Sequence, residues 1–451
     1  TGYDIDNSLK LEADNSEYLE RDPSSAGNRK LFTTSMWVKR TEIGQASTIF
    51  GVQPASSGSD ANTFQFGFTS GDKFQCGLQT FYALQSNRLF RDTSAWYHIV
   101  VAVDTTQSTA ANRIKLYVNG VQETSFSIQA TITQDSDLGI NFTEPHRIGT
   151  LLSNSWYFSG YIAEMNHIDG QTLTPTDFGE FDSDTGIWKP KAYAGSYGTN
   201  GFYLDFESSG SLGADSSGNS NNFTLNNITS ADQATDTPTN NFCTLNPLMT
   251  NAGSTNYLTV TEGGTKGVNA AAAYKISNSS IGLSSGKWYW EVKATDVNGV
   301  TAIGVTMPNY WDADYTLQGC IYYAQGPQRY NNASASSFGS GYSDGDIISF
   351  ALDMDATPPT MEVYKNNSSE GNLMAGLSIN GTGGAFLPEK KDFYFPKIVG
   401  YNANTFECNF GGYTSFSISS AESDANGYGN FEYAPPSGYY AICTKNLAED
   451  G

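Results

Sequence analysis

Basic residues are scarce in this sequence of 451 residues. Lys and Arg together number 24, against 46 Asp and Glu, and the formal net charge is −22 at pH 7. A nucleic-acid groove needs clustered Lys and Arg, so the composition argues against nucleic acid as a partner. An acidic surface suits simple solubility, which is the more economical interpretation, or the collection of divalent cations.

Cysteine is also rare, and its spacing carries no metal or disulfide pattern. The five cysteines are far apart, odd in number and without CxxC or Cys/His spacing: Cys76, Cys243, Cys320, Cys408 and Cys443. This pattern argues against a zinc site or a disulfide framework. We therefore predict buried free thiols, as in a protein assembled in a reducing cytosol.

Long apolar runs are missing as well. No run of about 18 apolar residues is present, so we predict no membrane insertion. Neither a signal peptide nor an initiator Met opens the sequence at Thr1, which favours a processed or truncated chain. We expect residues 445–451 to be a tail or the start of a further region.

Glycine and aromatic residues are abundant instead. The 46 Gly, 27 Tyr and 26 Phe are typical of a β-rich chain with many turns. Residues 286–293 read GKWYWEVK, which places Trp288, Trp290 and Val292 on one face of a strand. Asn119 and Gly120 separate two strand-like runs and predict a tight hairpin. We predict an all-β fold of two antiparallel β-sandwich (jelly-roll) domains in tandem.

Composition also predicts where the domains divide. The first sandwich is expected over residues 1–190 and the second over residues 251–444. Residues 191–250 are rich in Gly, Ser and Asn, as flexible linkers are. Two strand-like pieces within this stretch favour an ordered bridge that pairs strands with one or both domains.

Four motifs follow one another in the first domain. They are SMWVK at 35–39, WYHIV at 96–100, KLYVNG at 115–120 and FSGYIAE at 158–164. In this order they resemble the laminin-G/concanavalin-A-like family, whose members show W-x-H-(apolar)3, then L-Y-V-N-G, then F-x-G-x-I-(A/D)-E. The resemblance implies a laminin-G-like jelly roll.

The second domain carries a different set of motifs. They are GKWYWE at 286–291, GDII at 345–348, LDMD at 352–355 and VYKN at 363–366. The set resembles a SPRY domain, with Asn367 standing where Gly is usual. SPRY domains are protein-binding modules whose loops form the contact surface, so the resemblance implies a SPRY-like sandwich with a binding role.

The two domains in this order resemble virion surface proteins of tailed bacteriophages, especially marine ones. The resemblance implies a tail fibre, head fibre or capsid-associated adhesin, located in the virion and assembled in the host cytoplasm. Its implied partners are other virion proteins and a glycan or protein of the host surface. Fibres are usually trimers, so a homotrimer is implied, although no heptad or collagen repeat sets that symmetry here.

The sequence carries no recognisable catalytic pattern. Glucanases on this fold carry E-x-D-x-x-E on one strand, so that one carboxylate attacks and one protonates. Glu164 and Asp169 have the wrong separation, and Glu291 has no acidic partner at strand spacing. We predict no enzyme activity and no catalytic residues. A glycan depolymerase with its acid pair split across strands is the less favoured alternative.

The three histidines do not form a set either. His98 lies in an apolar strand and is expected to be a hydrogen-bonded structural residue. His146 and His167 lie near turns and are expected at the surface or rim.

Calcium is the one cofactor that the resemblance raises, since laminin-G relatives often hold it through oxygen ligands at loop edges. The candidate ligands are Asp182, Asp184, Asp215 and Asn219. Clusters of Asp, Asn, Ser and Gly are also ordinary turn formers, and we favour that interpretation.

Aromatic residues beside polar ones are the candidates for ligand binding. Aromatic side chains of a sandwich more often belong to its core, which is the competing interpretation. The group around Trp311 is the best exception, because polar residues surround it in an expected loop. The candidates are Trp156, Tyr157, Trp311, Asp312, Asp314, Tyr315, Tyr322, Tyr323, Arg329 and Tyr330.

Taken together, the sequence predicts a non-enzymatic phage surface protein that binds a glycan or protein of the host. The alternative is a capsid decoration protein without an external ligand.

Overall fold

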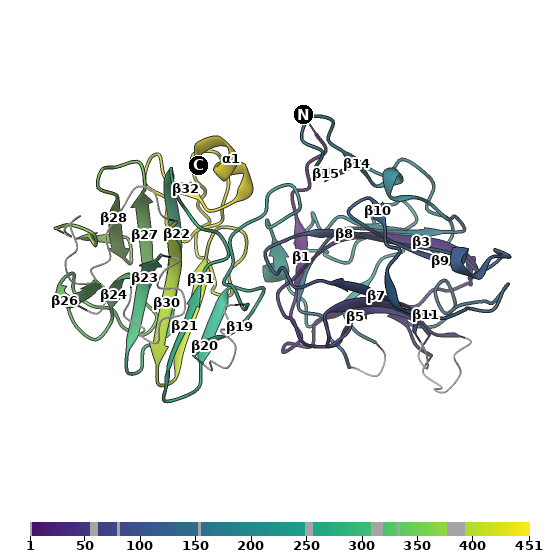
Figure 1. Ribbon diagram of the computed structural model, residues 1–451, viewed down its shortest axis with the longest axis horizontal. Helices are drawn as coiled ribbons and strands as arrows, with labels where there is room; N and C mark the ends of the chain where they lie inside the picture. Colours follow the sequence, from purple (N-terminus) through teal and green to yellow (C-terminus); the bar gives the residue numbers. More distant parts are fainter. Residues whose placement is uncertain are drawn as a thin grey trace. The chain divides into compact units, whose positions relative to one another are not determined.

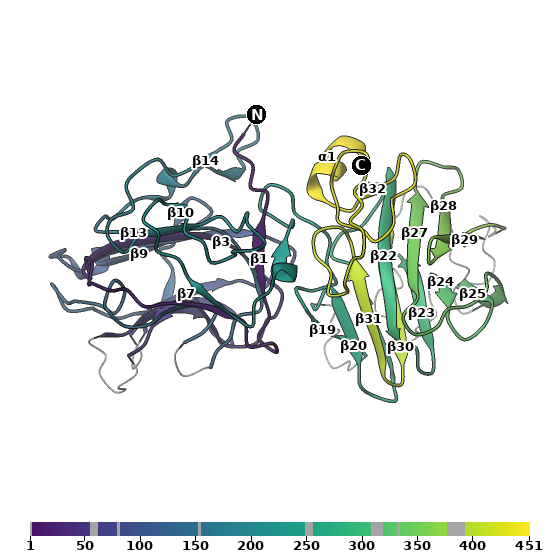
Figure 2. The ribbon, with the colours of Figure 1, turned by 180° about the vertical axis from the view of Figure 1, so that it is seen from behind.

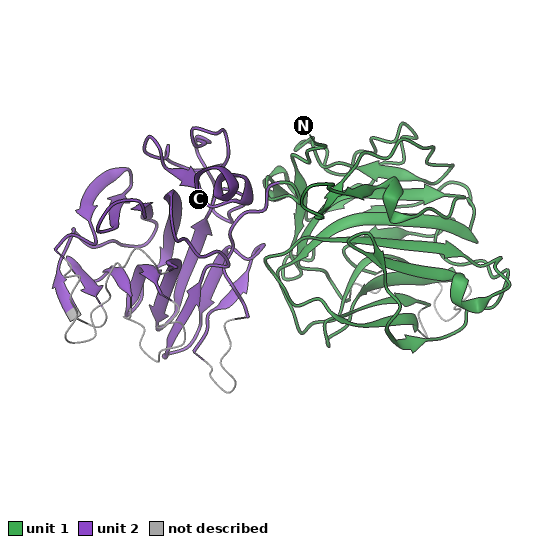
Figure 3. Ribbon diagram, turned by 45° about the horizontal axis from the view of Figure 1, so that its top comes forward, with its two compact units in different colours: residues 1–239 green, residues 240–451 purple. Residues whose placement is uncertain are grey.

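The computed structural model describes residues 2–54, 62–78, 82–151, 155–248, 256–307, 319–331, 334–376 and 393–451. The chain divides into two compact units, Thr1–Thr239 and Asn240–Gly451 (Figure 3). None of the helices in the described ranges has the length and apolar character that crossing a membrane requires.

Unit 1 is an antiparallel sandwich of two sheets, and Figure 1 shows β3, β8 and β9 in one layer with β5, β7 and β11 in the other. The β3 sheet has the order β10–β9–β8–β3–β13–β1–β18, and β16 also pairs with β13. Its strands are β10 (Val121–Gln122), β9 (Ile114–Val118), β8 (Tyr97–Asp104), β3 (Leu31–Arg40), β13 (Gly160–Asp169), β1 (Ser8–Leu11), β18 (Gln233–Ala234) and β16 (Phe202–Leu204).

The β2 sheet of unit 1 has the order β11–β7–β6–β5–β4–β12–β2–β17. Its strands are β11 (Phe126–Gln129), β7 (Tyr82–Leu89), β6 (Lys73–Gly77), β5 (Phe64–Phe68), β4 (Ser47–Val52), β12 (His146–Ile148), β2 (Tyr18–Arg21) and β17 (Thr224–Asn226). Further elements of unit 1 in the described ranges are a separate hairpin and short 3-10 turns: β14 (Gly179–Phe181), β15 (Trp188–Pro190), η2 (Ala110–Asn112), η3 (Pro175–Asp177) and η4 (Ser230–Asp232).

The core of unit 1 lies between these sheets and is rich in phenylalanine. Phe32, Phe50, Phe66 and Phe68 are each at most 1% exposed. Their rings meet edge-on or tilted, as aromatic pairs prefer. The predicted hairpin is confirmed, because Asn119 and Gly120 adopt φ of 48° and 80° between β9 and β10.

The stretch predicted as a bridge contributes strands to unit 1. β16, β17 and β18 pair with β13, β2 and β1, and the two units divide after Thr239. The ends of unit 1 also meet, because the Ile5 N–H donates to Thr239 Oγ1 at 3.0 Å and Thr239 Oγ1 donates to the Ile5 carbonyl at 2.9 Å. The short strands of this stretch therefore belong to the sheets they extend.

Unit 2 is a second antiparallel sandwich. Its β22 sheet has the order β19–β20–β31–β22–β27–β28–β29, with β32 parallel to β22, and β31, β22 and β27 lie side by side in Figure 2. Its strands are β19 (Thr259–Thr261), β20 (Lys266–Asn269), β31 (Asn404–Asn409), β22 (Lys287–Asp296), β27 (Ile347–Asp353), β28 (Thr360–Lys365), β29 (Ser368–Asn372) and β32 (Tyr440–Ala441).

The β23 sheet of unit 2 has the order β21–β30–β23–β24–β25–β26. Its strands, followed by the helix that ends the chain, are β21 (Tyr274–Asn278), β30 (Phe395–Tyr401), β23 (Thr301–Thr306), β24 (Cys320–Tyr323), β25 (Gln328–Asn331), β26 (Ser334–Ser337) and α1 (Thr444–Asp450). Trp288 and Trp290 are fully buried between the two sheets, as their alternation predicts, and Trp290 stacks on Phe350 at 5.0 Å. The predicted fold class, two antiparallel sandwiches in tandem, is confirmed.

The outer face of β22 is also buried at Tyr289 and Glu291, beneath residues 410–443, which we call the cover segment. Phe431 of this segment meets Tyr289 edge-on at 5.0 Å. Glu291 accepts hydrogen bonds from the backbone N–H groups of Glu432 and Tyr433, from the Tyr289 hydroxyl and from Asn409 Nδ2. Burial raises the pKa of Glu291 to about 7, although the four donated bonds lower it. The carboxyl therefore ties the cover segment to the sheet.

All five cysteines are buried and free, as the sequence predicts. Their burial raises the pKa of the Cys76 and Cys320 thiols to about 12, which leaves them protonated at neutral pH.

Candidate functional site

Strand β2 presents polar and aromatic side chains on the outer face of its sheet. Leu19 points into the core and is fully buried, so its neighbours Tyr18 and Glu20 point outward. Both are half-buried, and Thr224 and Asn226 of β17 lie directly opposite Glu20 and Tyr18. The outer face at this edge of the sandwich therefore carries an aromatic ring beside a carboxylate.

Arg147 of β12 fixes both of these side chains. It pairs in register with Glu20, and its Nε donates to Glu20 Oε2 at 2.5 Å. Its guanidinium carbon lies 4.6 Å from the centre of the Tyr18 ring, and Nη1 donates to the Leu151 carbonyl at 3.0 Å. A cation stacked on a ring and paired with a carboxylate holds that ring in one orientation.

Trp156 and Tyr157 extend the aromatic surface beyond β12. Trp156 is 42% exposed, and its φ of 61° lies in the left-handed region that non-glycine residues rarely adopt. Its carbonyl accepts a 2.7 Å hydrogen bond from the N–H of Thr48, which holds this turn against β4. The Tyr157 ring lies 6.3 Å from the Tyr18 ring. We call Tyr18, Glu20, Arg147, Trp156 and Tyr157 the aromatic patch.

A polar pocket of about 440 Å³ adjoins the patch through Glu20, which lines it. Its walls are polar side chains and turns from β2 and the loop before β17: Glu20, Arg21, Asp22, Ser24, Ser220, Asn221, Asn222 and Thr224. Arg21 Nη2 donates to Asn221 Oδ1 at 2.6 Å and to Asn200 Oδ1 at 3.2 Å. Burial lowers the pKa of Arg21, an effect that Asp215 and Asp169 oppose. The pocket offers hydroxyl, amide and carboxylate groups together.

The sequence predicted Trp156 and Tyr157 as ligand candidates but missed Tyr18, Glu20 and Arg147. The order Tyr18–Leu19–Glu20 already places the first and third residues on one face of a strand. Nothing in the sequence shows that Arg147 pairs with that strand, because the register between β12 and β2 is a tertiary contact. The patch joins residues from three separate segments.

Two of the calcium candidates, Asp215 and Asn219, shape one loop. Asp215 Oδ1 accepts from the N–H groups of Tyr203 and Ser217, and Oδ2 accepts from the Asn221 N–H and from Ser217 Oγ. Asn219 Nδ2 donates to the carbonyls of Gly198 and Gly201. The carboxylate lone pairs are therefore directed at N–H and O–H groups of the turn, which is the alternative that the sequence favoured.

Asp182 and Asp184 lie in the turn of the β14–β15 hairpin. Asp182 Oδ1 accepts from the N–H groups of Asp184 and Thr185 and from the Thr185 hydroxyl, and Lys189 donates to Oδ2 at 3.3 Å. These bonds, led by the Thr185 N–H, lower the pKa of Asp182 to about 2. Across the described ranges, no cluster of three or more Asp, Glu, His or Cys is arranged to hold a metal ion.

The unit 2 candidates fall into two groups. Trp311, Asp312, Asp314 and Tyr315 lie outside the described residues. Tyr322 is fully buried in the core, where its ring contacts Phe338 and Tyr342.

Tyr323 and Tyr330 lie on the opposite face of the same sheet, half-buried, with their rings 5.5 Å apart. Arg329 donates to the carbonyls of Leu373 and Ala375, at 2.6 and 2.7 Å. The structure thus divides the described tyrosine candidates of unit 2 between the core and one outer sheet face, and it places Arg329 against the chain beyond β29.

The histidines are all buried, and the expectation that His146 and His167 lie at the surface or rim is wrong. They are 2% and 1% exposed, because both rings pack against Phe50 of the core. Asn141 binds both, through its N–H to His146 Nε2 and through its Oδ1 to His167 Nε2. His98 accepts from Trp188 Nε1 at Nδ1, so its Nε2–H donates to Ser35 Oγ. Burial lowers the pKa of His98 and of His146 to about 3. All three are neutral structural residues near pH 7.

Glu164, considered as an acid from the sequence, is held by two tyrosines. The hydroxyl groups of Tyr203 and Tyr3 donate to its carboxyl oxygens at 2.6 and 2.9 Å. Burial, more than the repulsion of Asp205 and Glu207, raises its pKa to about 7, while the tyrosine bonds lower it. The arrangement anchors the chain around Tyr3 to β13.

Similar solved structures include the SPRY domain of human HERC1, 19% identical over 33% of this chain and 89% of that chain, with a TM-score of 0.26. Another is the heptameric SAP-like pentraxin from Limulus polyphemus, 16% identical over 38% of this chain and 80% of that chain, with a TM-score of 0.28.

A search of curated proteins finds no match. Residues 13–177, a segment of unit 1 that contains the whole aromatic patch, match the family described as the concanavalin A-like lectin/glucanases superfamily.

Proposed function

We propose that this chain is a non-enzymatic surface protein of a tailed-bacteriophage particle, and that the aromatic patch of unit 1 binds a glycan of the host surface. It would serve as a tail fibre, head fibre or capsid-associated adhesin, with other virion proteins as its structural partners. The observation that carries the glycan proposal is the pair of Tyr18 and Tyr157 rings, with the exposed Trp156 next to Tyr157 in the chain and a polar pocket that adjoins through Glu20.

The chemistry of the patch fits a sugar. Binding sites for small molecules combine apolar or aromatic surface with a few polar groups that fix orientation. Trp156 and Tyr157 offer rings to the apolar face of a pyranose. Asn222 and Thr224 in the adjoining pocket offer an amide and a hydroxyl group to sugar hydroxyls. The match of residues 13–177 to a superfamily that includes lectins supports the same proposal.

An array of immobilised bacterial surface polysaccharides, probed with the full chain, tests this function. We expect Trp156→Ala to weaken binding at least about 10-fold, since loss of a central aromatic contact costs roughly 2 kcal/mol. Phe393→Ala is the matched control, because Phe393 is also an exposed aromatic (50%) but lies outside the patch.

Three results would contradict the proposal. Binding that is indifferent to Trp156→Ala would remove the patch as the site. Absence of binding to every polysaccharide would favour a decoration protein without an external ligand. Release of reducing ends from a bound polysaccharide would show a depolymerase instead.

A further inference from the structure

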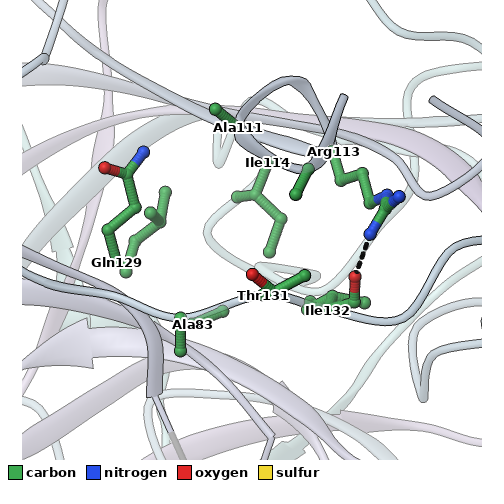
Figure 4. Close-up of a pocket in the computed structure, with 10 residues that line it drawn as sticks. Ala83, Ala111, Arg113, Ile114, Gln129, Thr131 and Ile132 are labelled. Atoms are coloured by element: carbon green, nitrogen blue, oxygen red, sulfur yellow. Dashed lines mark hydrogen bonds between the residues drawn. The ribbon is translucent and has the colours of Figure 1, made fainter. Parts of the chain in front are cut away.

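A second pocket lies in unit 1, on residues that the aromatic patch does not use. It has a volume of about 200 Å³ and lies between β7 and β11 of the β2 sheet and the chain entering β9 of the β3 sheet (Figure 4). Ala83 and Ala130 form one wall, and Ala111 and Ile114 face them. Small side chains at these positions leave the space between the sheets unfilled.

The size and the lining of this pocket select a small apolar group. An engineered apolar cavity of about 150 Å³ stays dry and binds benzene. The present pocket is slightly larger, so a single ring with a short substituent, or a short branched chain, fits it. Most of the lining residues are alanine, leucine and isoleucine, and the pocket opens to solvent at exposed residues that include Gln129 and Thr131.

One charged side chain lines the pocket as well. Arg113 is 7% exposed, and its guanidinium donates to the carbonyls of Gln107, Ser108 and Ile132 at 2.8, 3.1 and 2.6 Å. Figure 4 shows Arg113 and Gln129 on opposite sides of the pocket. Three of the five N–H groups of an arginine are thereby used, which leaves two.

The charge of Arg113 has no ionic partner in the part of the chain that the structure describes, since its three side-chain acceptors are neutral carbonyls. Buried cations are ordinarily paired with an anion, because desolvation of a lone charge is costly. A carboxylate at this end of the pocket would supply the missing charge through charge-assisted hydrogen bonds.

We propose that this pocket binds small carboxylic acids that carry one ring or one short branched chain. The apolar body lies between Ala83 and Ala130 on one side and Ala111 and Ile114 on the other. The carboxylate lies against Arg113. This site is separate from the aromatic patch, and it does not depend on the glycan proposal.

Titration of the full chain with benzoate, and separately with benzyl alcohol, tests the proposal by ligand-observed NMR. We expect benzoate to bind with a dissociation constant at or below about 1 mM, which its few heavy atoms permit. Benzyl alcohol, which has the ring without the charge, should bind at least about 10-fold more weakly, as loss of a charge-assisted bond implies.

Two variants locate the site. Ala130→Leu fills the pocket and should abolish binding of both probes, whereas Ala26→Leu, an equal change at an exposed alanine elsewhere in unit 1, should leave both unchanged. Arg113→Gln should remove the preference for benzoate while benzyl alcohol still binds, which also reports that the pocket is intact. If Arg113→Gln fails to fold, the proposal is still tested by the ratio of the benzoate and benzyl alcohol affinities of the wild-type chain and by the effect of Ala130→Leu.

Failure of benzoate to bind, or binding that survives Ala130→Leu, overturns the proposal. Equal binding of the two probes overturns the role of Arg113 and the choice of acids as ligands.

Discussion

Two strands of this molecule carry the same three-residue pattern but differ in how deeply its outward side chains are buried. Tyr18–Leu19–Glu20 of β2 and Tyr289–Trp290–Glu291 of β22 each place a buried apolar residue between an outward Tyr and an outward Glu. In unit 1 the outward pair stays half-buried and meets Arg147. In unit 2 the cover segment buries it completely.

The difference shows that strand alternation identifies the two faces of a sheet but not which face meets solvent. Glu20 can be part of a binding surface because it is only half-buried, with the Arg147 guanidinium beside it. Glu291 accepts from the N–H groups of Glu432 and Tyr433, in addition to Tyr289 and Asn409, because residues 410–443 return over β22. The cover segment therefore makes the outward Tyr and Glu of β22 part of a core, whereas the same pair in β2 belongs to the surface.

The largest expected effect on stability comes from replacing Tyr289 with alanine, compared with the same substitution at Tyr18. Tyr289→Ala removes a ring that is 1% exposed and packed on Phe431, so it should cost about 3–5 kcal/mol of unfolding free energy. Tyr18→Ala removes a half-buried ring and should cost about 1 kcal/mol. Urea unfolding of the two variants measures both values, and equal losses would show that the cover segment contributes little to the environment of Tyr289.

A smaller effect is expected from pH. The pKa of Glu291 is raised from 4.5 to about 7 in the folded state, so the folded state binds this proton more tightly than the unfolded state. The stabilisation is complete below pH 4.5 and is lost as pH rises through 7, to a total of up to about 3 kcal/mol at 1.36 kcal/mol for each pKa unit.

Glu291→Gln isolates this dependence, since glutamine does not titrate. The stability difference between wild type and Glu291→Gln should shrink by up to about 3 kcal/mol from pH 4.5 to pH 8, as measured by urea unfolding at each pH. Glu20→Gln is the matched control, because Glu20 occupies the same place in the Tyr18–Leu19–Glu20 pattern but is only half-buried. A wild-type minus Glu291→Gln difference that is constant across this range would contradict the prediction.

The smallest effect is expected from removing divalent cations. The carboxylates of Asp182 and Asp215 already accept hydrogen bonds from the N–H and O–H groups of their own turns. We therefore expect the thermal midpoint to be the same with and without EDTA, because no binding energy is lost. A lower midpoint in EDTA, restored by added calcium, would show that a cation competes for these oxygens and stabilises unit 1.

Local patterns predicted the strands and hairpins of both units well. The alternation around Trp288 and the Asn119–Gly120 turn depend on side-chain period and on positive φ, which neighbouring residues determine. The burial of His146 and His167 was missed, because Asn141 reaches them from a separate loop. The site was predicted only in part for the same reason: Trp156 and Tyr157 are visible in the sequence, whereas the register that brings Arg147 to Glu20 is not.

The meeting of Ile5 with Thr239 has a mechanical consequence. The chain enters unit 1 just before β1 and leaves it just after β18, and these two antiparallel strands pair with each other. Tension applied at the two ends would therefore act across the strands and open their hydrogen bonds one after another, rather than all together. The same geometry would let the whole unit be inserted into a surface loop of another protein, because Ile5 and Thr239, where the chain enters and leaves the unit, are in direct contact.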